Sequence, residues 1–406
     1  MATTMETPRS TGRVTAASIA HRAFAKLRRN APLSFLLLAS LLPAAAAAQA
    51  GKEPPAPPAY SVATMDLHPD QPIPFSAPGL AAIATKIKCG PGGDIYAIYS
   101  GNPAQELWRA PIRRVFLSSR RVTEYPAPAI SGYKEFTRAG FDVAPDGILY
   151  GLWQARPQSA SPTDAVAQYV DFIVKYKDDG AVDRFFPLAE LAGSHFHPTS
   201  LVMFADGNSL VSGTTRDKAP GPASPGVFSA IFDPTGALRA PVTLMKLAAS
   251  AEAGKSPGPP ISAIAADSQD AVSLASSVLS FSSPDGNVYL LHGDRLDVIS
   301  EDGSVQQKFT LAPPENDLTP VQMAAAGAGY LFIYYDHIAT GAPGESTQRR
   351  GMITVANTET GEIAAIYRVS QPSTDFTIPA CAVSMNDFVF LGTDHQNLLE
   401  VVHDRP

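Results

Sequence analysis

The sequence has few cysteines, few charged residues and few catalytic motifs. Charged residues make up 17% of its 406 positions, aromatic residues make up 8%, and there are two cysteines. Two cysteines exclude a four-cysteine zinc cluster, and the H-E-x-x-H, Walker, dinucleotide-binding and EF-hand motifs are missing. A function without catalysis is therefore favoured over an enzymatic one.

The sequence is instead rich in proline and glycine, with 37 and 30 residues respectively. This composition is typical of a chain with many turns and is unlike that of a helical bundle. A chain of this length can form one large all-β domain.

The first 50 residues differ from the rest of the chain. A basic stretch that ends in Lys26-Leu27-Arg28-Arg29 precedes an apolar segment, 31–50, whose last residues are Ala48-Gln49-Ala50. This order is typical of a secretory signal peptide, so we expect cleavage after Ala50 and export to the periplasm or the extracellular space. An uncleaved membrane anchor is the alternative, because the segment is just long enough to span a bilayer.

The expected mature chain is acidic. Residues 1–50 hold six of the 31 Lys and Arg residues and one of the 38 Asp and Glu residues, so the remainder has a net charge of −12. The densest basic clusters, 109–114 and 118–121, are short and fall in one predicted strand pair. We therefore expect no nucleic-acid binding, no stable membrane insertion after cleavage, and a monomer.

Apolar strands joined by tight turns repeat along the chain from Tyr60 onward, after a proline-rich tether at 51–59. Asp-Gly turns occur in FDVAPDGILYGLW (141–153) and VKYKDDGAVDRFF (174–186), and again seventeen residues apart in the stretch 281–311. Asp and Gly tolerate the positive φ that tight hairpins require, so each pair of turns closes two hairpins of one four-stranded sheet.

Six such units follow one another, and a single four-stranded sheet cannot bury both of its faces. Six sheets arranged radially can, and they leave few free edges. The predicted fold is therefore an all-β, six-bladed β-propeller of four-stranded antiparallel blades over residues 60–406. The last unit has only three strands, and the segment 59–68 is expected to complete it against 397–403.

The two halves of each repeat, as in VAPDGILYGLW and VKYKDDGAVDRFF, resemble the six-bladed propellers of the NHL and TolB-like group. The resemblance covers most of residues 60–406. It implies the fold and no single activity, because such propellers include enzymes, ligand-binding proteins and interaction platforms.

A propeller of this kind has two distinct faces. With strands A to D in each blade, the A-to-B and C-to-D turns form one face, here called the turn face. The B-to-C and D-to-A connections form the other, the loop face. The Asp-Gly turns lie on the turn face, so the longer connections are expected on the loop face.

Histidine and aspartate residues gather at the predicted loop face. The candidates for a metal or acid/base site are His195, His197, Asp336, His337, Asp394 and His395. Two histidines at i and i+2 can point the same way, and Asp-His recurs at equivalent places in two blades. Asp and His are also ordinary loop residues. No cofactor is therefore expected, and a divalent metal is the alternative.

Aromatic residues concentrate on the second strand of each blade, where packing between blades is the simplest interpretation. Trp153, Tyr334 and Tyr335 lie near the loop-face ends of these strands and are candidates for a recognition surface. Cys89 and Cys381 fall on the innermost strands of the first and last blades, which a closed ring makes neighbours. They form either a disulfide or two buried thiols.

Three functions remain open on the sequence alone. The favoured hypothesis is an exported, non-enzymatic propeller that binds a protein, peptide or glycan on the loop face. The alternatives are a metal-assisted hydrolase or lyase that uses the Asp and His candidates, and a structural envelope protein. The sequence does not identify the ligand.

Overall fold

The computed structural model describes residues 62–75, 84–99, 109–160, 169–190, 194–217, 226–242, 279–336, 351–369, 376–393 and 399–406. All of them belong to one compact unit, residues 57–406. The predicted signal peptide and the proline-rich tether lie outside the described residues. Among the described residues, no helix is long and apolar enough to cross a membrane.

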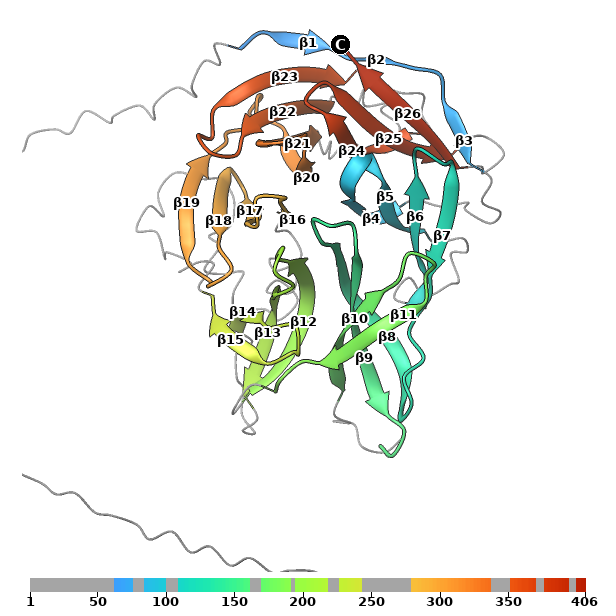
Figure 1. The fold of residues 1–406 in the computed structure, drawn as a ribbon. Helices are drawn as coiled ribbons and strands as arrows, with labels where there is room; N and C mark the ends of the chain where they lie inside the picture. Colours follow the sequence, from blue (N-terminus) through green and yellow to red (C-terminus); the bar gives the residue numbers. More distant parts are fainter. Residues whose placement is uncertain are drawn as a thin grey trace, which may run out of the picture. The chain divides into compact units, whose positions relative to one another are not determined.

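The chain forms six sheets around a central axis, so the predicted six-bladed β-propeller is confirmed (Figure 1). Blade I contains β4 (Ala84–Cys89), β5 (Ile95–Tyr99), β6 (Ile112–Phe116) and β7 (Arg121–Tyr125). Blade II contains β8 (Tyr133–Val143), β9 (Leu149–Pro157), β10 (Val170–Tyr176) and β11 (Val182–Pro187). Blade III contains β12 (Ser194–Met203), β13 (Ser209–Asp217), β14 (Gly226–Phe232) and β15 (Leu238–Pro241).

The remaining blades follow the same antiparallel order. Blade IV contains β16 (Leu279–Ser282), β17 (Val288–His292), β18 (Arg295–Ile299) and β19 (Val305–Thr310). Blade V contains β20 (Thr319–Ala325), β21 (Tyr330–Asp336), β22 (Gly351–Asn357) and β23 (Ile363–Val369). Blade VI contains β24 (Phe376–Ser384), β25 (Asp387–Thr393) and β26 (Leu399–Arg405).

The ring closes as predicted, through an N-terminal strand in the last blade, but with a different register. β1 (Thr64–Asp66) pairs in parallel with β23 of blade V, whereas β2 (His68–Pro69) and β3 (Ile73–Phe75) pair with β26. The expected pairing of 59–68 with 397–403 is therefore wrong. Leu67 is buried between blades V and VI, and Phe75 is buried between blades VI and I. Burial of these two side chains explains why the segment crosses from one blade to the next.

Six buried hydrophobic clusters hold the described blades together, one in each seam between neighbours. Because each sheet packs on both faces, its middle strands do not alternate between buried and exposed side chains. All five central residues of β21 are buried, and so are the first six of β22. This continuous burial explains the long apolar runs in the sequence.

The turns of the turn face are closed by their own side chains. Oδ1 of Asp146 accepts the N–H of Ile148 at 3.0 Å, and Oδ1 of Asp179 accepts the N–H of Ala181 at 2.9 Å. The same contact recurs in other blades at Asp206, Asp233, Asp285 and Asp302. The aspartates of the repeat are therefore used within their own turns.

Gly180 closes its turn and also allows that turn to contact the neighbouring blade. Its φ is +90°, and a Cβ there would lie 2.1 Å from the carbonyl oxygen of Glu124 in β7. Gly236 of blade III stands in the same relation to Pro187 in β11, also at 2.1 Å. The C-to-D turns of blades II and III thus dock on the outer strand of the preceding blade, and this contact requires glycine.

Candidate functional site

Strand β4 of blade I is connected to the inner strand of every other blade. The Lys88 ammonium lies 3.0 Å from Asp142 Oδ1 of β8, and it donates to the carbonyl oxygen of Ser280 in β16 at 2.6 Å. Asp142 Oδ2 in turn accepts the Ser282 hydroxyl and the Met203 N–H of β12, both at 2.8 Å. One ion pair therefore joins blades I to IV.

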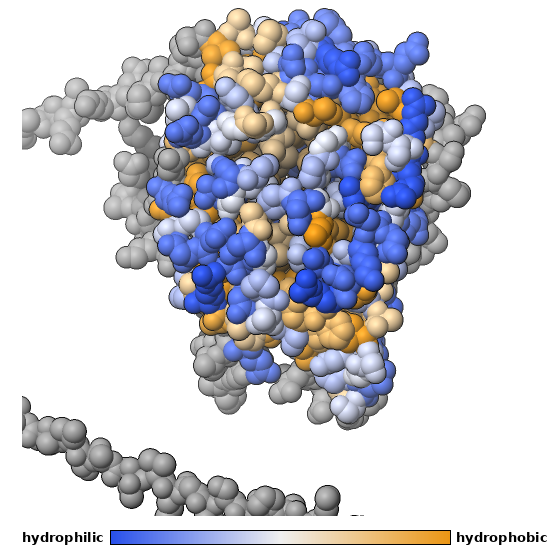
Figure 2. Space-filling view, viewed as in Figure 1, coloured by the Kyte–Doolittle hydropathy of each residue, from blue (hydrophilic) through white to orange (hydrophobic). Residues whose placement is uncertain are grey.

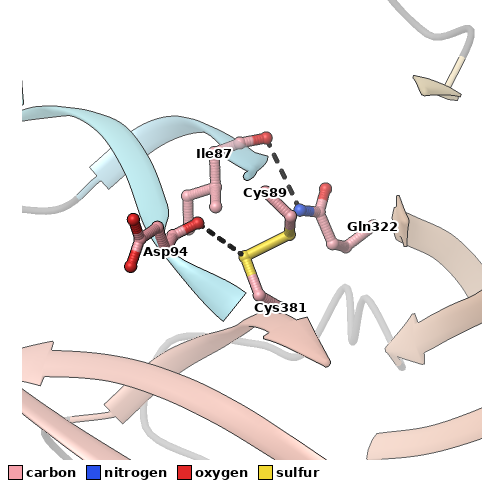
Figure 3. Close-up of a disulfide and its surroundings, with 5 residues drawn as sticks. All are labelled: Ile87, Cys89, Asp94, Gln322 and Cys381. Atoms are coloured by element: carbon pink, nitrogen blue, oxygen red, sulfur yellow. Dashed lines mark hydrogen bonds between the residues drawn. A yellow bond between two sulfur atoms is a disulfide. The ribbon is translucent and has the colours of Figure 1, made fainter. Parts of the chain in front are cut away.

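The two remaining inner strands are reached through residues next to Lys88. Gln322 of β20 donates to the Ile87 carbonyl at 3.5 Å, and Cys89 forms a disulfide with Cys381 of β24 (Figure 3). The Cα atoms of the two cysteines are 5.5 Å apart and 292 residues apart in sequence. Of the two states that the sequence left open, the structure contains the bridge. In the chain-entropy description, closing such a long loop stabilises the fold by about 5 kcal/mol.

Lys86 lies two residues before Lys88 on β4 and nearer the loop face. Its ammonium is 6.0 Å from the centre of the Phe141 ring. Burial, reinforced by the positive charge of Lys88, lowers the pKa of Lys86 to about 8. The turn-side end of the axis therefore holds a paired lysine, and the loop-side end holds one whose charge is destabilised.

A second polar group lies at the loop-side end of the seam between blades II and III. Asp171 of β10 and Gln154 of β9 are cross-strand neighbours, and the Gln154 amide donates to Asp171 Oδ1 at 2.8 Å. The same amide nitrogen lies 2.9 Å from Nδ1 of His197 on β12. Burial raises the pKa of Asp171 to about 7, although the hydrogen bond from Gln154 acts in the opposite direction.

The position of His197 follows from the local shape of β12. The pairing of β12 with β13 shifts between Pro198 and Ser200. Opposite this irregularity stands Gly213, where a Cβ would lie 2.1 Å from the His197 carbonyl oxygen. The missing side chain allows the two strands to approach, and His197 is left exposed at the end of the seam.

The predicted Asp and His candidates are described only in part. The side chains of His197 and Asp336 are described, and they belong to blades III and V respectively. The side chain of His195 and the whole of His337, Asp394 and His395 lie outside the described residues. Their convergence on one site stays a prediction. Within the described residues there is no group of three His, Cys, Asp or Glu side chains that could hold a metal ion.

The three aromatic candidates for a recognition surface are buried. Trp153 and Tyr335 have no exposed surface, and Tyr334 is 6% exposed. Trp153 packs in the cluster between blades I and II, Tyr335 in the cluster between blades IV and V, and Tyr334 in the cluster between blades V and VI. A side chain buried between blades offers no surface to a partner, so these residues stabilise the seams instead.

Two arginines of the basic clusters in blade I are paired with acidic side chains, and a third lies over an aromatic ring. Arg113 lies 2.7 Å from Glu124, and Arg114 lies 2.8 Å from Asp94 and 3.1 Å from Asp178. The guanidinium of Arg121 lies over the Phe116 ring. Arg113, Arg114 and Arg121 all lie on the predicted strand pair, now β6 and β7.

Sequence reasoning missed the residues that the structure brings together. Lys86 and Lys88 in ATKIKC, and Asp142 in FDV, are charged residues inside otherwise apolar inner strands, and this anomaly was the available signal. Asp171 likewise interrupts an apolar strand. The segment Gly254-Lys255-Ser256-Pro257-Gly258 also matches G-x-S-x-G, the pattern around the nucleophilic serine of many hydrolases. It lies outside the described residues.

Fold and site together define a six-bladed β-propeller with a hydrogen-bonded axis. No protein-family model matches the chain, and no curated protein matches it. Solved structures similar to it include a protein of unknown function from Dyadobacter fermentans, at 9% identity over 84% of this chain and 99% of that one, with a TM-score of 0.45.

Two further solved structures show the same weak likeness. A protein of unknown function from Bacteroides caccae is 13% identical over 71% of this chain and 82% of that one, with a TM-score of 0.36. The calcium-binding protein regucalcin from Agrobacterium tumefaciens is 12% identical over 85% and 97%, with a TM-score of 0.37. None of these similarities carries a functional argument for this chain.

Proposed function

We propose that this chain is an exported, non-enzymatic β-propeller that binds a protein, peptide or glycan on its loop face. The supporting observation is the polar group of Asp171, Gln154 and His197 at the loop-side end of a seam. The imidazole is exposed there, whereas the aspartates of the turns are occupied by their own backbone. Accessible polar groups held by a rigid sheet are the usual components of a recognition site.

The loop face also has the longer connections and an exposed aromatic residue. The connections 242–278 and 337–350 join strands on this face. Tyr169, just before β10, is 56% exposed. Binding residues are often carried by long connections on a rigid scaffold, and tyrosine is common at such interfaces because it buries a large area at little entropic expense. In the view of Figure 2, hydrophobic residues lie scattered among hydrophilic ones.

The matched pair Tyr169 and Leu238 tests which face binds. Leu238 is 42% exposed and follows a tight turn of the turn face. The protein is recovered from the cell envelope, where mass spectrometry should find Gly51 at its N-terminus, and it is screened on a glycan array and a peptide-display library. For the best ligand, Tyr169→Lys should weaken binding at least tenfold and Leu238→Lys less than twofold. Equal losses for both variants, or no ligand in either screen, contradict the proposal.

The alternative function, a metal-assisted hydrolase or lyase, requires a different protonation state of His197. With the Gln154 amide donating to Nδ1, a neutral imidazole carries its proton on Nε2, and a metal ligand needs a lone pair at that atom. The described arrangement therefore orients His197 as a hydrogen-bond donor. Hydrolysis of a selected glycan or peptide on addition of a divalent metal would favour the enzyme instead.

A further inference from the structure

The axis of the ring contains more positive than negative charge around Lys86. The charged groups that act on this lysine are Lys88 on its own strand and Asp142 and Arg138 on β8. Among the described residues, three cations, Lys86 included, are thus balanced by one carboxylate. In the part of the chain that the structure describes, no carboxylate lies within ion-pairing distance of the Lys86 ammonium.

Asp142 compensates Lys86 only in part, because its oxygens are already paired with other groups. One of its oxygens faces the Lys88 ammonium, and the other accepts the Ser282 hydroxyl and the Met203 N–H. Arg138 is stacked over the Trp153 ring at 5.7 Å and donates to the Ala110 carbonyl oxygen. Among the described residues, these hydrogen bonds and the ion pair around Lys86 are therefore made without it.

The Lys86 ammonium lies next to Gly140 of β8. A Cβ built on Gly140 would be 3.6 Å from Lys86 Nζ. The same Cβ would be 3.5 Å from the Thr199 carbonyl oxygen and 3.6 Å from the Ser200 Cα, where β12 loses its regular pairing. The residue as a whole is partly exposed, although its ammonium is the part that burial destabilises.

We propose that Lys86 binds the anionic group of a small ligand, a carboxylate or a phosphate, in the loop-side part of the axis above the Lys88–Asp142 pair. An anion there balances the excess positive charge and replaces the lost hydration of the ammonium. This site goes beyond the proposed function and does not depend on it, because it lies in the axis and needs no macromolecular partner.

The protonation of Lys86 provides a direct readout. An anion stabilises the charged form, so binding raises the lysine pKa from about 8 and takes up protons at higher pH. Affinity should accordingly be greatest below pH 8 and fall about tenfold per pH unit above it. An ordinary exposed lysine titrates near pH 10.4 and shows neither effect at pH 8.

Competitive acetylation of the wild-type mature protein tests the proposal without any variant. Lysine labelling is measured by mass spectrometry between pH 6 and 11 in a low-chloride buffer, alone and with sodium acetate or sodium phosphate. We expect the labelling midpoint of Lys86 near pH 8, and a rise of one unit or more with the bound anion. Lys177, exposed in a turn of the turn face, is the internal control and should not shift. A shift with acetate alone assigns a carboxylate ligand, and a shift with phosphate alone assigns a phosphate.

Calorimetry with the same two anions gives the second measurement. Lys86→Met should weaken binding of the effective anion at least tenfold, whereas Lys177→Met should leave it unchanged. An unshifted Lys86 midpoint with both anions overturns the proposal, and so does equal affinity in Lys86→Met and wild type. Failure of the glycan and peptide screens would not affect either result, so the two proposals fail separately.

Discussion

Aspartates on the two faces of the ring have opposite electrostatic surroundings. In a turn of blade IV, the Ser300 hydroxyl and the Ser304 N–H donate to Asp302 and lower its pKa to about 2. At the loop-side end of the seam between blades II and III, burial raises the pKa of Asp171 to about 7. The first carboxylate is stabilised by the fold in its ionised form, and the second is destabilised.

The two lysines of β4 repeat this contrast along the axis. Lys88 at the turn-side end is paired with Asp142, whereas burial destabilises the charge of Lys86 at the loop-side end. Perturbed ionisable groups gather at functional sites more often than elsewhere. This contrast is the reason that we propose binding at the loop-side end of the axis and at the loop face, and a role in folding for the turn face.

The largest effect is expected from removing the carboxylate that joins four blades. Asp142→Ala leaves Lys88 and the Met203 N–H buried without their partner, and it should lower the free energy of unfolding by about 4 kcal/mol. Urea unfolding followed by tryptophan fluorescence measures the loss. Lys86→Met, at the other end of the axis, should cause no loss. If Lys86→Met destabilises the protein as much as Asp142→Ala, the two ends of the axis do not differ.

A smaller effect is expected from adding a methyl group to a turn glycine. Gly180→Ala should lower the free energy of unfolding by about 3 kcal/mol, because it combines an unfavourable φ of +90° with a clash against Glu124. The matched control is Gly132→Ala, which has a φ of +85° and nothing within 4 Å. Its free energy of unfolding should fall by about 1 kcal/mol, because only the unfavourable φ contributes. Similar losses in both variants would mean that docking of the turn on blade I contributes nothing.

The smallest effect concerns Asp171 and depends on pH. Its folded pKa of about 7 is above its unfolded value of about 4, so the folded protein binds more protons in that interval and loses stability as the pH rises from about 4 to about 7. Allowing for its partial exposure, the loss is about 2 kcal/mol. Asp171→Asn keeps the acceptor for Gln154, and it should remove this pH dependence and leave stability at pH 4 unchanged.

Thermal unfolding of wild type and Asp171→Asn between pH 4 and pH 8 measures the difference. The matched control is Asp178→Asn, whose side chain is 82% exposed and which should preserve the wild-type slope. A wild-type slope in Asp171→Asn would show that the Asp171 carboxyl is not destabilised by burial.

Sequence patterns were a good guide to the fold and a poor guide to the site. The Asp-Gly turns predicted the hairpins because their requirement is local: a positive φ and a side chain that reaches its own backbone. The Trp153, Tyr334 and Tyr335 prediction was wrong because strand position does not show whether a neighbouring blade covers a side chain. Asp171 and His197 meet across a seam, and only the docking of two blades brings them together.

The sequence by itself determined the six repeats, the antiparallel order of the strands and the closure of the ring in the last blade, because hydrophobic periodicity and turn chemistry act over a few residues. Tertiary structure alone decided the exact closing register, which follows from the burial of Leu67 and Phe75 in two different seams. It alone also decided that Lys88 is paired with a carboxylate and that Lys86 has no such partner among the described residues. Charges two residues apart on one strand look alike in sequence, and their energies differ only after four blades converge on one carboxylate.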